Sequence, residues 1–213
     1  MAKVLNVAVF ASGRGSNFRA ILDNIDRGEI KARISIIISN RSDAGIFNIA
    51  QDRNIPYRHI NPSDYTTEKD YCSEVLSLLD ECSVGLIVLA GYLKKIPSEI
   101  ITQYRNRIMN IHPALLPAFG GQGMYGMKVH QAVVEYGAKV TGVTVHFVDE
   151  EYDHGPIILQ EPIGVDDDDT PELLAEKVLS VEHRVYSRAI KLFAEDRLSI
   201  DGRRVYVKNN KGK

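Results

Sequence analysis

The sequence predicts an α/β protein whose mostly parallel, twisted sheet is flanked by helices. Short, continuous apolar runs of the kind that form strands buried on both faces recur through the first half of the 213-residue chain. Segments with helical spacing of apolar residues separate these runs, and such alternation is typical of parallel strands joined by crossover helices. The second half has longer β-rich runs and one long helical segment, so we expect mixed strand directions there.

The first half contains five predicted strands, each a short apolar run that ends at Gly, Ser, Asn or Pro: Val4–Phe10, Ile34–Ile38, Tyr57–Ile60, Val84–Ala90 and Arg107–His112. Between them, four segments have helical spacing or a helix-start signal: Phe18–Ile25, closed by Gly28, then Gly45–Arg53, Tyr71–Cys82, and a short helix that begins near Pro97.

The second half begins with two predicted strands, Lys139–Val148 and Gly155–Val165. Thr170-Pro171 then opens a helix, with Thr as N-cap and Pro at the first helical position. A terminal hairpin is expected over residues 197–207, turning at Asp201-Gly202. No internal repeat or low-complexity linker is visible, so we expect one domain over residues 1–213, with a phosphate-binding half (1–105) and a catalytic half (106–207).

The composition excludes several classes of function. Net charge is −2 and no Lys/Arg cluster forms, which argues against a nucleic-acid partner. No apolar run is long enough to span a bilayer, so we expect a cytoplasmic protein with no membrane partner. The two cysteines, Cys72 and Cys82, are expected to be reduced thiols. The histidines lack the spacing of a recognisable zinc site, so no metal is expected.

The loop Gly13-Arg14-Gly15-Ser16-Asn17 follows the first strand and opens a helix. Backbone N–H groups at a helix N-terminus form an anion site, and glycine lets a ligand approach them closely. The loop has neither the dinucleotide fingerprint nor the P-loop pattern. A single phosphate held by the amides of Gly15, Ser16 and Asn17 fits better. A tight strand–helix turn without a ligand remains an alternative.

The candidate catalytic side chains lie at the end of the fifth strand. The period of two places Asn110 and His112 on one face, and Pro113 ends the strand. Asp153 lies in an acidic loop before Gly155-Pro156, which should fix its position. A carboxylate beside an imidazole orients it and raises its pKa, and an amide donor can stabilise an oxyanion.

Asn, His and Asp without a Ser or Cys nucleophile indicate direct transfer between two substrates. A capped strand end beside an acidic solvent loop remains the alternative. Glu182 lies in the middle of a helix, off its apolar stripe, and faces either solvent or a ligand.

Four segments together resemble the phosphoribosylglycinamide formyltransferases, a folate-dependent family of purine synthesis, in order over residues 4–195: Ser12–Asn17, Leu89–Leu93, Asn110–Pro117 and Asp153–Ile158. The central motif Asn-x-His-Pro-x-Leu-Leu-Pro is highly specific to folate-dependent formyl transfer. The resemblance implies a Rossmann-like first half, 10-formyltetrahydrofolate as co-substrate and glycinamide ribonucleotide as acceptor. It leaves monomer and homodimer open.

The resemblance also implies site roles. Asn110 and protonated His112 would stabilise the tetrahedral oxyanion, and Asp153 would orient and charge His112. Gly15, Ser16 and Asn17 would hold the phosphate of the ribonucleotide, and Glu182 its ribose hydroxyls. The folate pocket would be lined by the following residues: Leu93, Lys94, Phe147, Val148, Asp149 and Asp153.

Two departures from the family pattern stand out. The Gly- and Met-rich stretch Ala118–Lys128 is longer than expected, and His154 occupies the place of a smaller residue. The nearest rival is a 10-formyltetrahydrofolate hydrolase, whose extra N-terminal domain does not fit before a strand that starts at Val4. Methionyl-tRNA formyltransferase has a further C-terminal domain, whereas a short tail, Lys208–Lys213, follows the hairpin here. A non-catalytic nucleotide-binding module is the alternative from another class.

Overall fold

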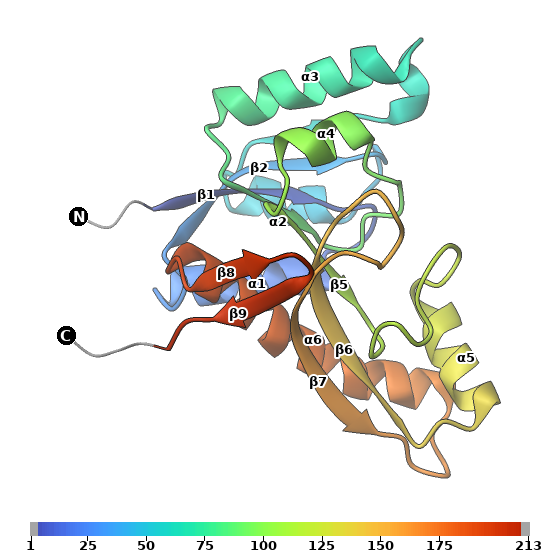
Figure 1. Cartoon of the computed structure of the whole chain (residues 1–213). Helices are drawn as coiled ribbons and strands as arrows, with labels where there is room; N and C mark the ends of the chain where they lie inside the picture. The colour runs from blue at the N-terminus through green and yellow to red at the C-terminus, as the bar shows by residue number, and fades with distance from the viewer. Residues whose placement is uncertain (1–3, 210–213) are drawn as a thin grey trace. The chain divides into compact units, whose positions relative to one another are not determined.

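The computed structural model describes residues 4–209, so the last part of the predicted tail, residues 210–213, lies outside the described residues. The chain forms two compact units, one ending at Met109 and the other beginning at Asn110. The boundary falls within strand β5 (Ile108–His112). The figures show the elements of each unit, coloured along the chain (Figure 1).

The first unit contains a parallel sheet with the strand order β3-β2-β1-β4. Its strands match four of the predicted runs: β1 (Leu5–Phe10), β2 (Ala32–Ser39), β3 (Tyr57–His59) and β4 (Leu86–Leu89). Continuous burial of β4 and of most of β1 explains their unbroken apolar sequence, because a parallel strand between helices has no face in water.

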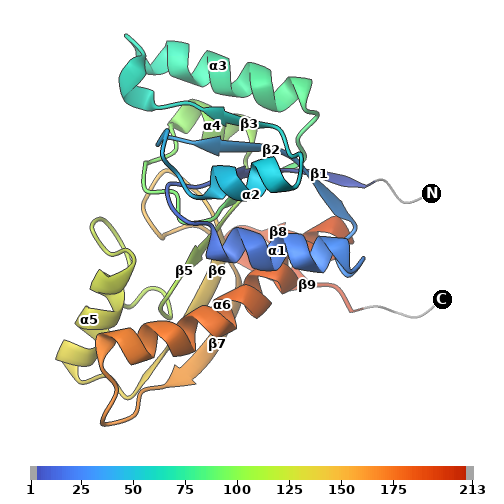
Figure 2. The ribbon, with the colours of Figure 1, turned by 180° about the vertical axis from the view of Figure 1, so that it is seen from behind.

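Helices cover both faces of the first unit's sheet. In Figure 2, α1 (Ser16–Asp26) and α2 (Ile46–Asp52) lie in front of the strands. In Figure 1, α4 (Ser98–Gln103) lies in front, next to α3 (Glu68–Glu81). A 3-10 turn over Pro62–Asp64 precedes α3. The sequence predicted all four helices, because each shows an apolar stripe or a start signal.

The second unit has a mixed sheet with the order β5-β6-β7-β9-β8. Its strands after β5 are β6 (Val140–Phe147), β7 (Ile157–Gly164), β8 (Leu198–Asp201) and β9 (Arg204–Val207). β6 and β7 are antiparallel, as are β8 and β9, whereas β7 and β9 are parallel. The prediction of an α/β fold with mixed C-terminal strands is confirmed.

Helix α6 (Pro171–Ala194) packs on β6 and β7, and α5 (Met127–Tyr136) packs against α6 (Figure 2). Thr170 caps α6 as predicted, since its side chain accepts a hydrogen bond from the Leu173 N–H. Helix α5 was not predicted from the sequence. Among residues 4–209, no helix is long and apolar enough to cross a membrane.

Candidate active site

The three predicted catalytic side chains meet in the second unit. Asn110 and His112 come from β5, and Asp153 comes from the loop between β6 and β7. One Asp153 oxygen, Oδ2, lies 3.4 Å from His112 Nδ1, and the other, Oδ1, accepts from Asn110 Nδ2 at 3.4 Å. The period-two argument therefore holds, because Asn110 and His112 both reach the same carboxylate.

A tight turn aims the Asp153 side chain. Asp153 has a φ of +53°, which is unusual for a residue with a side chain. A Cβ on Gly155 would lie 1.9 Å from the Phe147 carbonyl oxygen, so only glycine allows the chain to pass this close to β6. The Phe147 N–H donates to the Pro156 carbonyl at 2.9 Å and closes the turn. The Gly155-Pro156 pair thus contributes to the placement of Asp153 as expected.

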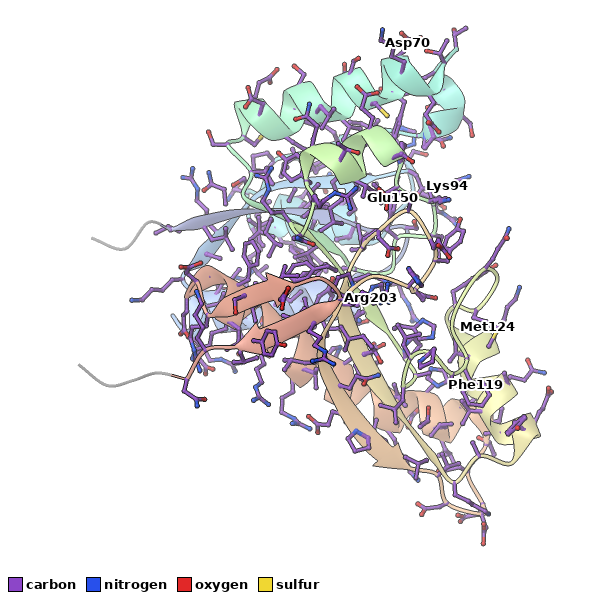
Figure 3. The ribbon with its side chains drawn as sticks, viewed as in Figure 1. Asp70, Lys94, Phe119, Met124, Glu150 and Arg203 are labelled. Carbon is purple, nitrogen blue, oxygen red and sulfur yellow. The ribbon has the colours of Figure 1, made fainter. Side chains whose placement is uncertain are left out.

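The stretch Ala118–Lys128 supplies two backbone partners to this cluster. The carbonyl of Phe119 accepts a hydrogen bond from His112 Nε2 at 2.8 Å. The Gly121 N–H donates to Asp153 Oδ2 at 3.0 Å. Figure 3 shows Phe119 near α5 and Met124 farther along the same loop. Both nitrogens of His112 therefore face an acceptor.

His146 is a fourth member of the cluster, and the sequence predicted no catalytic role for it. It is 2% exposed, and its Nδ1 donates to the Phe147 carbonyl at 2.8 Å. Its Nε2 then accepts from Asn110 Nδ2 at 3.3 Å and lies 3.7 Å from Asp153 Oδ1. A histidine in a buried strand just before the acidic loop was the available signal.

Burial lowers the pKa of His112, while the Asp153 carboxylate and the Phe119 carbonyl act in the opposite direction. Asp153 thus acts on this pKa in the expected direction, but the net shift is downward because desolvation of the imidazolium outweighs its two acceptors. Burial would also raise the pKa of Asp153, but His146, His112 and the Gly121 amide together lower it. The site thus pairs a carboxylate whose ionised form is favoured with an imidazole whose neutral form is favoured, and that neutral form is the one that can accept a proton.

The predicted phosphate loop lies in the first unit. Gly15 is the N-cap of α1 and has a φ of +78°. As a glycine, it has no side chain that could cap the first turn. Ser16 is the first helical residue, and Asn17 follows it. A Cβ on Gly15 would lie 3.1 to 3.3 Å from the side-chain carbons of Ile46. The backbone here has the form of an anion site at a helix N-terminus.

Ser12 joins this loop to the segment that follows β4. Its N–H donates to the Gly91 carbonyl at 3.0 Å, and its Oγ accepts from the Leu93 N–H at 2.9 Å. Its hydroxyl donates to Asn40 Oδ1 at 2.6 Å. Leu93 is 56% exposed and Lys94 is also exposed (Figure 3), so both side chains are accessible to a ligand.

The other predicted residues lie in the second unit. Glu182 is 8% exposed on α6, so the solvent-facing alternative is wrong. Val148 and Asp149 are half-buried, and Asp149 Oδ2 accepts from His154 Nδ1 at 2.8 Å. Phe147 is 1% exposed and packs edge-on against Phe193, so its side chain belongs to the core. Among residues 4–209, no group of three or more His, Cys, Asp or Glu could hold a metal.

The chain is similar to known formyltransferases. The sequence profile described as formyl transferase matches residues 5–190. A chloroplastic phosphoribosylglycinamide formyltransferase from Arabidopsis thaliana is 43% identical over 90% of this chain. The chain spans 66% of that relative, just under two thirds of its length. A phosphoribosylglycinamide formyltransferase from Bacillus subtilis is 36% identical over 86% of this chain and 92% of the relative.

Solved structures agree with this result. Glycinamide ribonucleotide transformylase 1 from Symbiobacterium toebii matches with a TM-score of 0.90 and 40% identity, covering 97% of this chain and 95% of that one. A formyltetrahydrofolate deformylase from Pseudomonas syringae matches with a TM-score of 0.86 at 27% identity, and this match covers 98% of this chain but 67% of that one.

Proposed function

Because the chain belongs to the formyl transferase family, we propose that it transfers the formyl group of 10-formyltetrahydrofolate to the amine of glycinamide ribonucleotide in purine synthesis. The observation that carries the proposal is the position of Asp153, whose two oxygens face Asn110 and His112 separately. A carboxylate, an imidazole and an amide in contact suit proton transfer beside a developing oxyanion.

The reaction runs through a tetrahedral intermediate. The amine nitrogen of the ribonucleotide attacks the formyl carbon, and the carbonyl oxygen becomes an oxyanion. The amine loses a proton, the bond from the formyl carbon to N10 breaks, and N10 takes up a proton. Asn110 stabilises the oxyanion through the N–H that now donates to Asp153 over 3.4 Å, since a bond of that length is weak and readily replaced.

His112 and Asp153 transfer the proton that leaves the amine of the ribonucleotide. With its lowered pKa, His112 is neutral before the reaction. In the tautomer that carries its proton on Nδ1, facing Asp153, Nε2 exchanges the Phe119 carbonyl for the substrate, accepts the proton of the attacking amine and leaves the ring as an imidazolium. The ionised Asp153 then stabilises that imidazolium, which donates to the oxyanion or to N10. Asp153 faces Nδ1 throughout and keeps the ring in one orientation, which limits the reorganisation that the reaction requires.

The two substrates bind through different parts of the chain. The amides of Gly15, Ser16 and Asn17 bind the ribonucleotide phosphate at the N-terminus of α1, and the buried Glu182 binds the ribose hydroxyls. The folate is bound by two segments. One contains Leu93 and Lys94, and the other runs from the Phe147 backbone through Val148 and Asp149 to Asp153.

The decisive experiment follows release of tetrahydrofolate from 10-formyltetrahydrofolate with and without glycinamide ribonucleotide. Release that requires the ribonucleotide, with one formylated product per tetrahydrofolate, is the expected result. Release in its absence would instead identify a hydrolase, the alternative suggested by the deformylase neighbour. Binding of ribonucleotide without any turnover would support a non-catalytic nucleotide-binding module.

The setting of the enzyme is part of the same proposal. We expect it to act in the cytoplasm on small-molecule substrates, without nucleic acid, membrane or metal. Activity should therefore persist after chelation of divalent ions. Sedimentation at the assay concentration distinguishes the two expected states, monomer and homodimer.

A further inference from the structure

His154, at whose position the family resemblance implied a smaller residue, is held on two sides. Its Nδ1 donates to Asp149 Oδ2 at 2.8 Å, within the same loop. Arg203, at the turn between β8 and β9, contacts both its ring and its backbone. Figure 3 shows Arg203 at the end of the terminal hairpin. We call Asp149, His154 and Arg203 together the clasp.

One nitrogen of the Arg203 guanidinium, Nη1, contacts the face of the His154 ring. Its Nη1 lies 3.3 Å from His154 Nδ1 and 3.2 Å from His154 Nε2. One donor cannot bond in the ring plane to both nitrogens, because their in-plane directions diverge and Nδ1 already donates to Asp149. Nη1 therefore lies over the ring, as Arg often does on aromatic side chains. Its Nη2 donates to the His154 carbonyl.

The clasp acts on the residue next to Asp153. Asp153 has a φ of +53°, a conformation that costs free energy for a residue with a side chain and persists only where neighbours enforce it. The His154 carbonyl that Arg203 binds belongs to the residue directly after Asp153. On the other side of the loop, Asp149 Oδ1 accepts from the Glu151 N–H at 3.1 Å. The clasp thus holds the loop before and after Asp153.

We propose that Arg203 is a positioning residue, which stacks on His154 to hold the 149–154 loop in the geometry that aims Asp153 at Asn110 and His112. This inference rests on the proposed function for its kinetic consequence, but not for its structural one. Asp149 and His154 lie within residues 5–190, where the family profile matches, and Arg203 lies beyond them.

The test compares four single variants and one double variant with the wild-type chain. The single variants are Arg203→Ala, Arg203→Lys, His154→Ala, and Arg204→Ala as the matched control. Arg204 is the next residue of the same hairpin, is exposed and has the same charge. Arg203→Ala should lower kcat about tenfold, because small misplacements of a catalytic group have effects of this order or larger, and leave the KM for the ribonucleotide unchanged. Arg204→Ala should retain wild-type kcat.

Arg203→Lys keeps the charge but loses the planar stack and the second donor, so its kcat should stay closer to that of Arg203→Ala. His154→Ala should lower kcat by a similar factor. Combining it with Arg203→Ala should lower kcat by clearly less than the product of the two single effects, since both changes remove the contact between Arg203 and the His154 ring. Equal kcat in the Arg203→Ala and Arg204→Ala variants would overturn the proposal.

Amide hydrogen exchange tests the clasp without any activity. In Arg203→Ala, the peptide that contains residues 149–154 should exchange faster than in Arg204→Ala, while β6 stays protected. Unchanged exchange in that peptide, or an equal acceleration throughout the second unit, would overturn the clasp. If the wild-type chain proved inactive, the proposed function would fail, and exchange alone would still decide whether Arg203 holds the loop.

Discussion

The two candidate ligand sites are built from different parts of the polypeptide. The glycine loop of the first unit, residues 13–17, offers main-chain amides at the N-terminus of α1, and Gly13, Arg14 and Ser16 are exposed. In the cluster of the second unit, side-chain atoms of Asn110, His112, His146 and Asp153 contact one another with little exposure. One site depends on backbone conformation, and the other on side-chain chemistry.

The difference follows from what each site must do. An anion needs several donors in fixed directions, and successive amides of a helix N-terminus provide them whatever the side chains are. A proton transfer needs groups whose protonation changes near neutral pH, and only certain side chains have that property. Changing a side chain of the cluster should therefore mainly lower kcat, whereas changing the backbone conformation of residues 13–17 should mainly raise the KM for the ribonucleotide.

The largest effect is expected from His112→Ala. Loss of the imidazole should lower kcat by about 10²- to 10⁴-fold, the usual contribution of a general acid or base. Ribonucleotide affinity, measured by calorimetry, should stay within a factor of about two, because the proposed ribonucleotide contacts, residues 15–17 and Glu182, do not include His112. A variant with unchanged turnover and an unchanged unfolding midpoint would remove His112 from the mechanism.

In the glycine loop, residues 13–17, comparing Gly15→Ala with Gly13→Ala tests whether backbone conformation determines ribonucleotide binding. Alanine at position 15 must adopt a φ of +78°, which costs about 1–2 kcal/mol, and its Cβ would crowd Ile46. The KM for the ribonucleotide should then rise about 5- to 30-fold with little change in kcat. A Cβ added to Gly13 would meet no atom within 4 Å, so Gly13→Ala should behave as wild type. Equal effects of both changes would show that conformation is not the determinant.

The same contrast explains what the sequence could predict. The buried parallel strands are recognisable as apolar runs, and Thr170-Pro171 marks the start of α6 through local chemistry. Asn110 and His112 follow from a period of two, and their partner Asp153 from a turn at Gly155-Pro156. All of these are properties of a few consecutive residues.

What the sequence could not predict depends on tertiary context. Helix α5 follows a glycine-rich stretch, and its N-cap is Gly126. Glycine has no side chain that could cap the helix, so the sequence does not mark where α5 begins. The lowered pKa of His112 depends on burial that only the folded chain defines. The same is true of Phe147, whose side chain lies in the core, and of the contact between His154 and Arg203, which are 49 residues apart.

Acid should act mainly on the second unit. The pKa values of His112, His130 and His183, all in that unit, are lowered by burial. A native pKa below the unfolded value means that the unfolded state binds the proton first, so stability is lost as pH falls below about 6.5. The lowered pKa of Asp153 acts in the same direction at lower pH, below about 4.

The variant His112→Asn isolates one of these contributions. Between pH 6.5 and 5, its unfolding free energy in urea should fall less steeply than that of the wild type, by up to about 1.4 kcal/mol per pH unit. His130 and His183 should leave a residual slope. An identical slope in both proteins would mean that His112 takes up its proton equally well in the folded and unfolded states.

The smallest effects should come from two threonine caps, one in each unit. Thr67 Oγ accepts from the Asp70 N–H at 3.1 Å at the start of α3, and Thr170 Oγ accepts from the Leu173 N–H at 3.3 Å at the start of α6. Each change to Ala should lower the unfolding free energy by about 1 kcal/mol, and each change to Ser should retain most of it.

Replacing either cap should leave kcat unchanged, because neither Thr67 nor Thr170 is among the residues proposed to contact a substrate. The stricter test is Thr170, since α6 also carries the buried Glu182, twelve residues beyond the cap. Fraying of the first turn should not extend that far, because helix ends loosen over about one turn. If Thr170→Ala raised the KM for the ribonucleotide while Thr67→Ala did not, α6 would transmit a change at its end to the ribose, and Glu182 would depend on the helix as a whole.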